Sequence, residues 1–103
     1  MNQVERIQEM ERIFDKAKEA VSDLSEALEA FEGCEKELKK LEDYYAGARW
    51  MKDFEDDEAG KLPADLKRGV LSEDGVYDLL TDNRENLIRM MKICTRVAEK
   101  HLI

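Results

Sequence analysis

Apolar residues in the first third of the chain recur at alternating steps of three and four. The seam they form is Ile7, Met10, Phe14, Ala17, Val21, Leu24, Leu28 and Phe31. This alternation is the heptad pattern of a helix that buries one narrow stripe. The sequence therefore predicts a long helix over about residues 2 to 46.

The spacing of this seam changes beside Gly33. A step of three from Phe31 to Cys34 replaces the expected step of four, and the stripe then continues to about Ala48. Such a slip overwinds a helix locally or marks a kink. Glycine also costs ~1 kcal/mol in a helix interior. The sequence leaves open whether the first helix is continuous or breaks at Gly33.

A second seam runs to the end of the chain. Its members are Val76, Leu80, Asn83, Leu87, Met90, Cys94, Val97 and His101. Ser72 precedes it with a hydroxyl that can cap free N–H groups, and Glu73 and Asp74 add negative charge at the positive end of the dipole. We expect a second helix over about residues 73 to 102, in which Asn83 fixes the register and His101 lies in the last turn.

The segment between the two seams, residues 47 to 71, contains three glycines and the only proline. Trp50, Met51 and Phe54 have the spacing of a short helix. Pro63 resembles the first residue of another short helix, which Gly69 would end. We therefore expect a connector with short helical turns inside a single helical domain, residues 1–103.

The predicted fold class is all-α, a long antiparallel helical hairpin of the coiled-coil kind. Residues 19 to 35 carry six acidic side chains and no cation, and antiparallel pairing would set them opposite Arg89, Lys92, Arg96 and Lys100. The first helix is longer than the second, so its face at Ile7, Met10, Ile13 and Phe14 needs a cover. We expect a homodimer there, or a three-helix bundle if the first helix breaks at Gly33.

Composition narrows the classes of function. The net charge of -8 argues against a nucleic-acid binder or an anionic-membrane binder. No apolar run approaches the ~20 residues that span a bilayer. Cys34 and Cys94 are isolated cysteines, which suits a cytoplasmic location, and we expect both to be small core-facing groups.

Candidate chemistry is sparse. The acidic run from Asp53 to Glu58 offers oxygen ligands, but an EF-hand loop opening at Asp53 would need glycine at its sixth place and glutamate at its twelfth, where this chain has Glu58 and Ala64. One histidine cannot form a metal cluster or a plausible catalytic triad. We therefore predict no catalytic residue, no metal site and no cofactor, and interpret the acidic run as a solvated turn.

Aromatic residues gather where the first helix ends, the connector turns and the second helix begins. The candidate interaction surface comprises Tyr44, Tyr45, Trp50, Phe54, Arg68 and Tyr77. These side chains could form a small core that closes the hairpin tip. The alternative is a binding site, because Trp and Tyr dominate interface hot spots.

The stretch LEDYYAGARWMKDFEDDEAGKLPADLKRGVLSEDGVYDLL, Leu41 to Leu80, resembles a family of short bacterial proteins known only as a domain of unknown function. The resemblance rests on Tyr44, Tyr45, Trp50, the Leu62-Pro63 step and the run from Arg68 to Asp74. It departs from the family at Gly47, where serine is usual. The resemblance implies a cytoplasmic, helical bacterial protein and contributes no activity or substrate.

Three hypotheses about function remain. The first is a non-enzymatic protein-interaction or scaffold module that self-associates and contacts an unidentified protein partner. The second is a small-molecule or divalent-metal-dependent activity at the connector. The third is an acidic decoy for a nucleic-acid-binding protein, suggested by the carboxylates of residues 19 to 35.

Overall fold

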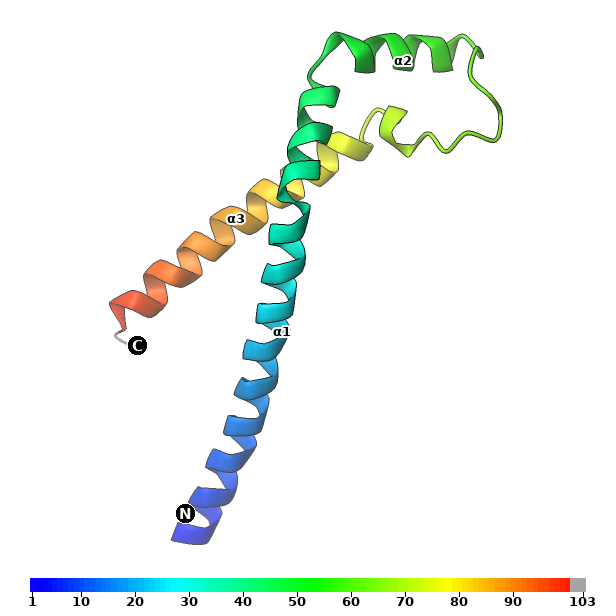
Figure 1. Cartoon of the computed structure of the whole chain (residues 1–103). Helices are drawn as coiled ribbons and strands as arrows, with labels where there is room; N and C mark the ends of the chain where they lie inside the picture. The colour runs from blue at the N-terminus through cyan, green and yellow to red at the C-terminus, as the bar shows by residue number, and fades with distance from the viewer. Residues whose placement is uncertain (101–103) are drawn as a thin grey trace. The chain divides into compact units, whose positions relative to one another are not determined.

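The computed structural model describes residues 1–100 and consists of helices joined by short connections (Figure 1). In chain order these are α1 (Gln3–Tyr45), α2 (Ala48–Glu58), the 3-10 helix η1 (Gly69–Leu71) and α3 (Gly75–Glu99). Residues 1–100 are 82% helical, and no strand occurs among them. The predicted all-α class is confirmed.

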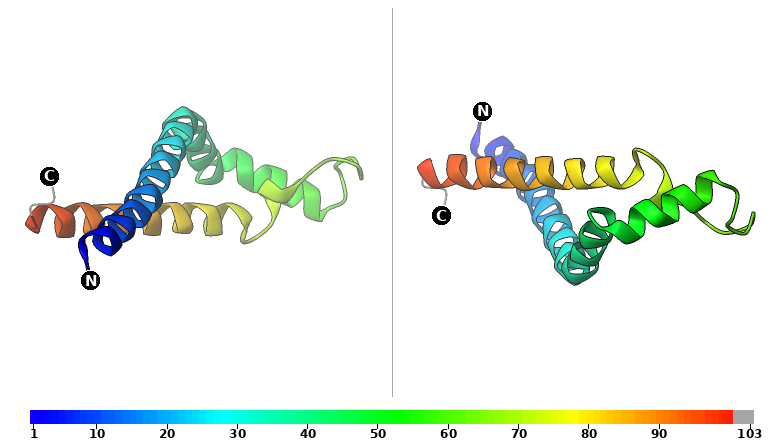
Figure 2. Two further views of the ribbon diagram at one scale, coloured as in Figure 1. Left: turned by 90° about the horizontal axis from the view of Figure 1, so that it is seen from below. Right: turned by 90° about the horizontal axis from the view of Figure 1, so that it is seen from above.

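Helix α1 is continuous for 43 residues and passes through Gly33 without interruption (Figures 1 and 2). Asn2 caps its start: the Oδ1 atom accepts the Glu5 N–H at 2.8 Å, and the Nδ2 atom donates to the Glu5 carboxylate at 3.1 Å. The break at Gly33, on which the three-helix-bundle alternative depended, does not occur. One glycine costs only ~1 kcal/mol in a helix, and the regular residues on both sides outweigh it.

The chain divides into two compact units, Met1–Leu38 and Lys39–Ile103. The first unit is a single helix. The second unit contains the last turns of α1, then α2, η1 and α3. Leu71 and Val76 are the two residues that are buried within residues 1–100, and both lie in the second unit. The core of this protein is therefore small and sits where η1 meets the start of α3.

Helix α2 is the short helix that the spacing of Trp50, Met51 and Phe54 predicted. It ends at Glu58, and Gly60 just beyond its C-cap residue Ala59 adopts the left-handed conformation with φ 71°. The Gly60 N–H donates to the Asp57 carbonyl at 3.0 Å and the Lys61 N–H to the Asp56 carbonyl at 2.9 Å. These are the bonds by which a glycine cap satisfies the last carbonyls of a helix.

The prediction of a short helix from Pro63 to Gly69 is wrong. Residues 61–68 form an irregular segment with one turn, in which the Leu66 N–H donates to the Pro63 carbonyl at 3.2 Å. The Arg68 guanidinium also donates to the Pro63 and Leu66 carbonyls, the groups that a helix would have used internally. Gly69 opens η1 instead of ending a helix.

Ser72 caps the beginning of α3 as predicted. Its Oγ accepts the Gly75 N–H at 3.0 Å and donates to the Gly69 carbonyl at 2.9 Å, so that one hydroxyl connects η1 to α3. Regular helix begins at Gly75 and ends at Glu99, against predicted limits of 73 and 102. The prediction for His101 lies outside the described residues.

The expectation that Cys34 and Cys94 face a core is wrong, because both thiols are exposed. Cys34 belongs to a helix that contains no buried residue, and Cys94 lies near the far end of α3 from Val76. A seam position is buried only where another element covers it. Asn83, also in the seam, is half-buried.

Candidate functional site

Three aromatic rings stack where α1 gives way to α2. The Tyr45 and Trp50 rings meet edge to face with centroids 5.0 Å apart. Trp50 and Phe54, four residues apart on α2, stack with centroids 5.1 Å apart. All three side chains are half-buried. Edge-to-face and offset-stacked pairs are the favoured aromatic geometries, so the rings fix the angle of the turn between the helices.

Trp50 also joins α2 to η1. Its indole Nε1–H donates to the Val70 carbonyl at 2.8 Å, across twenty residues of sequence. The indole ring thus packs on aromatic neighbours while its one polar atom is satisfied by the backbone. This bond holds the returning segment, residues 59–68, beneath α2 (Figure 1).

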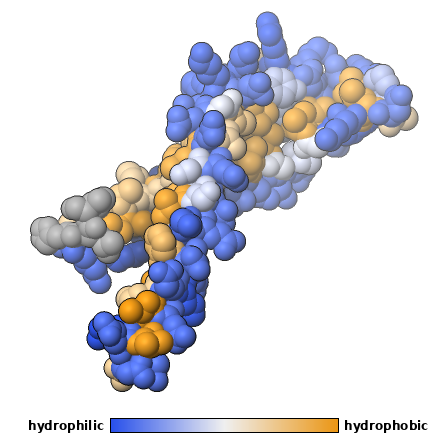
Figure 3. Space-filling model, turned by 60° about the horizontal axis from the view of Figure 1, so that its bottom comes forward, coloured by the Kyte–Doolittle hydropathy of each residue, from blue (hydrophilic) through white to orange (hydrophobic). Residues whose placement is uncertain are grey.

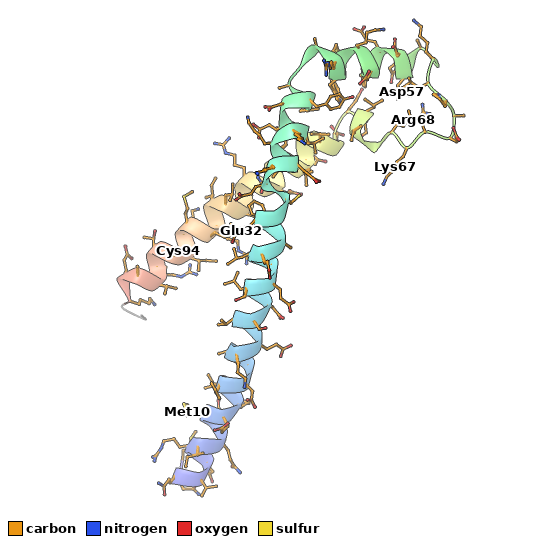
Figure 4. The ribbon with its side chains drawn as sticks, viewed as in Figure 1. Met10, Glu32, Asp57, Lys67, Arg68 and Cys94 are labelled. Atoms are coloured by element: carbon orange, nitrogen blue, oxygen red, sulfur yellow. The ribbon has the colours of Figure 1, made fainter. Side chains whose placement is uncertain are left out.

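Arg68 makes the second link between the returning segment and α2. Its guanidinium pairs with the Asp57 carboxylate and also donates to the Pro63 carbonyl and, at 3.2 Å, to the Leu66 carbonyl. Asp57 on α2 and Arg68 point toward one another, whereas Lys67 next to it points outward (Figure 4). The guanidinium suits this set of acceptors because its donors point in fixed directions within one plane.

Tyr44 makes the third link, between α1 and α2. Its hydroxyl donates to the Asp53 carboxylate at 2.6 Å. This hydrogen bond raises the pKa of Tyr44 to about 12, because loss of the proton would set a phenolate against a carboxylate. We call the Trp50, Arg68 and Tyr44 links together the connector clasp.

The acidic run is helical, which corrects the solvated turn expected from the sequence. Asp56 accepts hydrogen bonds from Lys52, 3.0 Å away at its closer oxygen, and lies 3.9 Å from the Lys61 ammonium. The hydrogen bond to Asp56 raises the pKa of Lys52. Within residues 1–100 no group of three or more His, Cys, Asp or Glu side chains is arranged to hold a metal ion.

The candidate interaction surface predicted from the sequence divides into two parts. Tyr44, Tyr45, Trp50, Phe54 and Arg68 are half-buried, and all five make contacts within the second unit. Tyr77, at the start of α3, is 59% exposed. The structure thus brings the first five together and leaves Tyr77 at the surface.

A shallow apolar groove lies nearby in the same unit. Its lining includes Leu41, Val70, Val76, Leu79 and Lys67. Further along α3 two more grooves share the Met91 side chain. One is lined by Leu87, Met90 and Cys94, and the other by Ile88, Arg96 and Glu99.

The predicted self-association face is fully at the surface. Ile7, Met10, Ile13 and Phe14 are between 43% and 57% exposed. The Lys18 ammonium lies 5.1 Å from the centre of the Phe14 ring, where it covers part of one side. Figure 3 shows apolar side chains, in orange, at the surface among hydrophilic ones, and Figure 4 shows Met10 projecting from α1.

Sequence reasoning missed the three links of the connector clasp as pairings. The partners are nine residues apart for Tyr44 and Asp53, eleven for Asp57 and Arg68, and twenty for Trp50 and Val70. No helical or strand periodicity relates such positions. The sequence indicated the residues through their clustering in the connector, but not which of them bond to each other.

Two long helices and a clasped connector define a small all-α protein. Over residues 7–93 the sequence matches the family described as Domain of unknown function (DUF4298), and the chain belongs to that family. The matched range contains the whole stretch from Leu41 to Leu80 that carries the resemblance. No curated protein and no solved structure matches the chain.

Among the described residues, none of the helices has both the length and the apolar character needed to cross a membrane.

Proposed function

We propose that this protein is a small cytoplasmic protein-interaction module that self-associates through the apolar stripe of α1. The observation that carries the proposal is a helix of 43 residues without one buried residue. An isolated helix cannot bury its own stripe, and helices in water owe most of their stability to packing on another element. The exposed thiols of Cys34 and Cys94 fit a reducing compartment.

The exposed apolar side chains of α1 offer enough area for a stable interface. The eight large ones are Val4, Ile7, Met10, Ile13, Phe14, Val21, Leu24 and Leu28. At on the order of 100 Å² each they present roughly 800 Å², about what one partner buries in an interface of standard size. Patches of this kind on a soluble protein mark interaction sites.

An activity at the connector has less support. The carboxylates of Asp53, Asp56 and Asp57 already accept hydrogen bonds from Tyr44, Lys52 and Arg68 respectively. A metal ion or substrate would have to displace those partners. The connector clasp is better explained as the structure that sets the start of α3 against α2.

The test is the mass of the purified chain in solution, by size-exclusion chromatography with light scattering over a range of concentrations. We expect a dimer of about twice the 12.0 kDa of one chain. The double variant Ile7→Lys/Phe14→Lys should be monomeric, because each lysine would bring a charge into the apolar interface. A wild-type chain that stays monomeric at every concentration would overturn the proposal.

The matched control is Gln8→Lys/Ser22→Lys, which adds the same charge to α1 outside the stripe and should leave the dimer intact. Trp50 lies in the second unit, so its fluorescence reports whether that unit stays folded in each variant. If the stripe variant and the control variant dissociate equally, α1 does not associate through its stripe.

A further inference from the structure

The apolar face of α3 is wider than one partner helix can cover. Besides the seam through Leu80, Leu87 and Cys94, large apolar side chains lie on both flanks of it. Those exposed on one flank are Leu79 and Ile93, and those on the other are Tyr77 and Met91. A helix that packs against a single partner needs only the two seam positions of each heptad, whereas one inside a bundle uses flanking positions as well.

Met91 shows this most clearly. It is 62% exposed and lines two grooves, one shared with Met90 and Cys94 and the other with Ile88 and Arg96. A partner helix seated in one groove would leave the other uncovered. Two neighbouring helices are therefore needed to take the whole face of α3 out of water.

Helix α1 also carries apolar residues beside its seam, but on one flank only. One flank of its seam carries Ile13, Ala20 and Ala27, and the other flank is polar. Its face thus covers three positions of each heptad, which is the width found in helical bundles. Each chain offers two long helices, so two copies supply the four that such faces require.

Charge decides which helices are neighbours. Residues 19–35 of α1 carry Glu19, Asp23, Glu26, Glu29, Glu32 and Glu35, all exposed. None of these six forms an ion pair within the described part of the chain. Two such stretches side by side would repel, because bundle helices lie 8–10 Å apart, about one Debye length at physiological salt.

The second half of α3 has the opposite charge over the same length. Residues 84–100 carry Arg84, Arg89, Lys92, Arg96 and Lys100 against only Glu85 and Glu99. Both stretches comprise 17 residues, or roughly 25 Å of helix. Figure 4 shows Glu32 projecting from the acidic stretch and Cys94 from the basic one.

We propose that two copies of the chain form a four-helix bundle in which the acidic stretch of α1 in each copy lies beside the basic half of α3 in the other. This proposal rests on the proposed self-association and specifies which helices of the two copies are neighbours. Both helix faces are covered, and the like-charged α1 helices do not lie side by side. The arrangement is two-fold symmetric, because α1 of each copy contacts α3 of the other in the same way.

Two charge-reversed chains test the arrangement. One chain carries Glu19→Lys, Glu26→Lys and Glu29→Lys on α1, and the other carries Arg84→Glu, Arg89→Glu and Arg96→Glu on α3. Either chain alone sets like charges side by side and should dimerise about tenfold more weakly or worse, since several repulsive pairs of a few tenths of a kcal/mol each act together. Mixed in equal amounts, the two chains should form a heterodimer that is much tighter than either chain's own dimer, because both contacts between copies again join opposite charges.

The heterodimer distinguishes contact between copies from contact within one chain. If the acidic and basic stretches paired only within a chain, mixing would restore nothing. A control with Glu11→Lys, Asp15→Lys and Glu37→Lys makes the same change in net charge outside the acidic stretch, and it should dimerise like the wild type. If each reversed chain alone dimerised as tightly as the wild type, the four-helix arrangement would be overturned, and the proposed self-association would stand.

The width of the α3 face has its own test. Met91→Gln keeps the length of the side chain and should weaken the dimer about tenfold, the effect of leaving a polar amide in a buried flank. Lys92→Gln, at the neighbouring outward position, should change dimerisation little. An unchanged dissociation constant for Met91→Gln would show that the flank stays in water and would overturn the bundle in favour of a simple pair of helices.

Discussion

The helix of residues 3–38 and the unit that begins at Lys39 are stabilised in different ways. Every link in residues 1–100 that joins two secondary-structure elements through a side chain belongs to the second unit, as do both buried residues. The described contacts of the first unit are local: hydrogen bonds along its helix, the ion pair of Glu9 with Arg12, and the Lys18 ammonium over the Phe14 ring. Exposed pairs of that kind contribute little to stability.

This difference shows which kinds of contact stabilise each part of the chain. The second unit uses aromatic side chains and the hydrogen bonds of Tyr44, Trp50 and Arg68 to fold a short connector, and its stability should depend on its own contacts. The first unit has strong helix-forming composition and an uncovered apolar stripe, so its stability should depend on whatever packs against it. The stability of the second unit should therefore change with substitutions in its core, and the stability of the first unit should change with protein concentration.

The largest expected effect comes from Leu71→Ala in η1. Leu71 is 6% exposed, and truncation of a buried leucine costs about 2–4 kcal/mol in unfolding free energy. Because the core is small, the loss of one buried side chain removes a large share of the stabilisation that the core provides. Urea unfolding followed by Trp50 fluorescence should show a large loss of stability in the second unit.

The matched control for that variant is Leu66→Ala in the same part of the chain. Leu66 is 47% exposed, so the same change of side chain should cost well under half as much. Equal effects of the two variants would mean that burial in η1 does not stabilise the second unit, and the contrast between the two units would fail.

The long helices were the predictable part of this fold. The seam from Ile7 to Phe31 repeats over several turns, and this repetition predicted α1 to within a residue or two at each end. The slip beside Gly33 was ambiguous because a local cost of ~1 kcal/mol does not reveal whether distant contacts favour a break. The capping role of Ser72 was also predictable, since a hydroxyl before a run of acidic residues acts through local geometry.

The connector was predictable only as a region. The rule that placed a helix after Pro63 considers backbone preference alone, and it fails because Arg68 takes up the carbonyls of Pro63 and Leu66. Burial at Cys34 failed for a related reason. A periodic stripe specifies which face of a helix is apolar, but it does not specify what covers that face.

The two units should also respond in opposite directions to the same change, glycine to alanine. A Cβ atom at Gly75 would lie 2.5 Å from the Ser72 Oγ and 2.9 Å from the Gly69 carbonyl oxygen, so Gly75→Ala should cost about 1–3 kcal/mol. A Cβ atom at Gly33 meets nothing within 4 Å, and Gly33→Ala should stabilise α1 by about 0.5–1 kcal/mol. Trp50 fluorescence reports the first change, and circular dichroism at 222 nm reports the second.

Opposite signs for these two variants would sharpen the contrast between a unit whose backbone is closely packed and a helix that is open on all sides. If Gly75→Ala were neutral, the Ser72 hydroxyl would have moved aside without loss, and its capping bonds would not contribute to the stability of the second unit. If Gly33→Ala destabilised the protein, something would have to lie against α1 at Gly33 in solution.

Tyr44→Phe removes one hydrogen bond of the connector clasp and should cost only about 1 kcal/mol near neutral pH. Because the pKa of Tyr44 is raised to about 12 from an ordinary value near 10, the folded state holds this proton more tightly than the unfolded state. The contribution of Tyr44 is therefore complete below pH ~10 and is lost as the pH rises through about 12. Urea unfolding at pH 8 and at pH 11 should show wild type and Tyr44→Phe converging at the higher pH, whereas a difference that stays constant would mean that Asp53 does not hold the proton. Tyr77, 59% exposed and without a hydrogen-bond partner in the described residues, offers the control, since Tyr77→Phe should be neutral at both values.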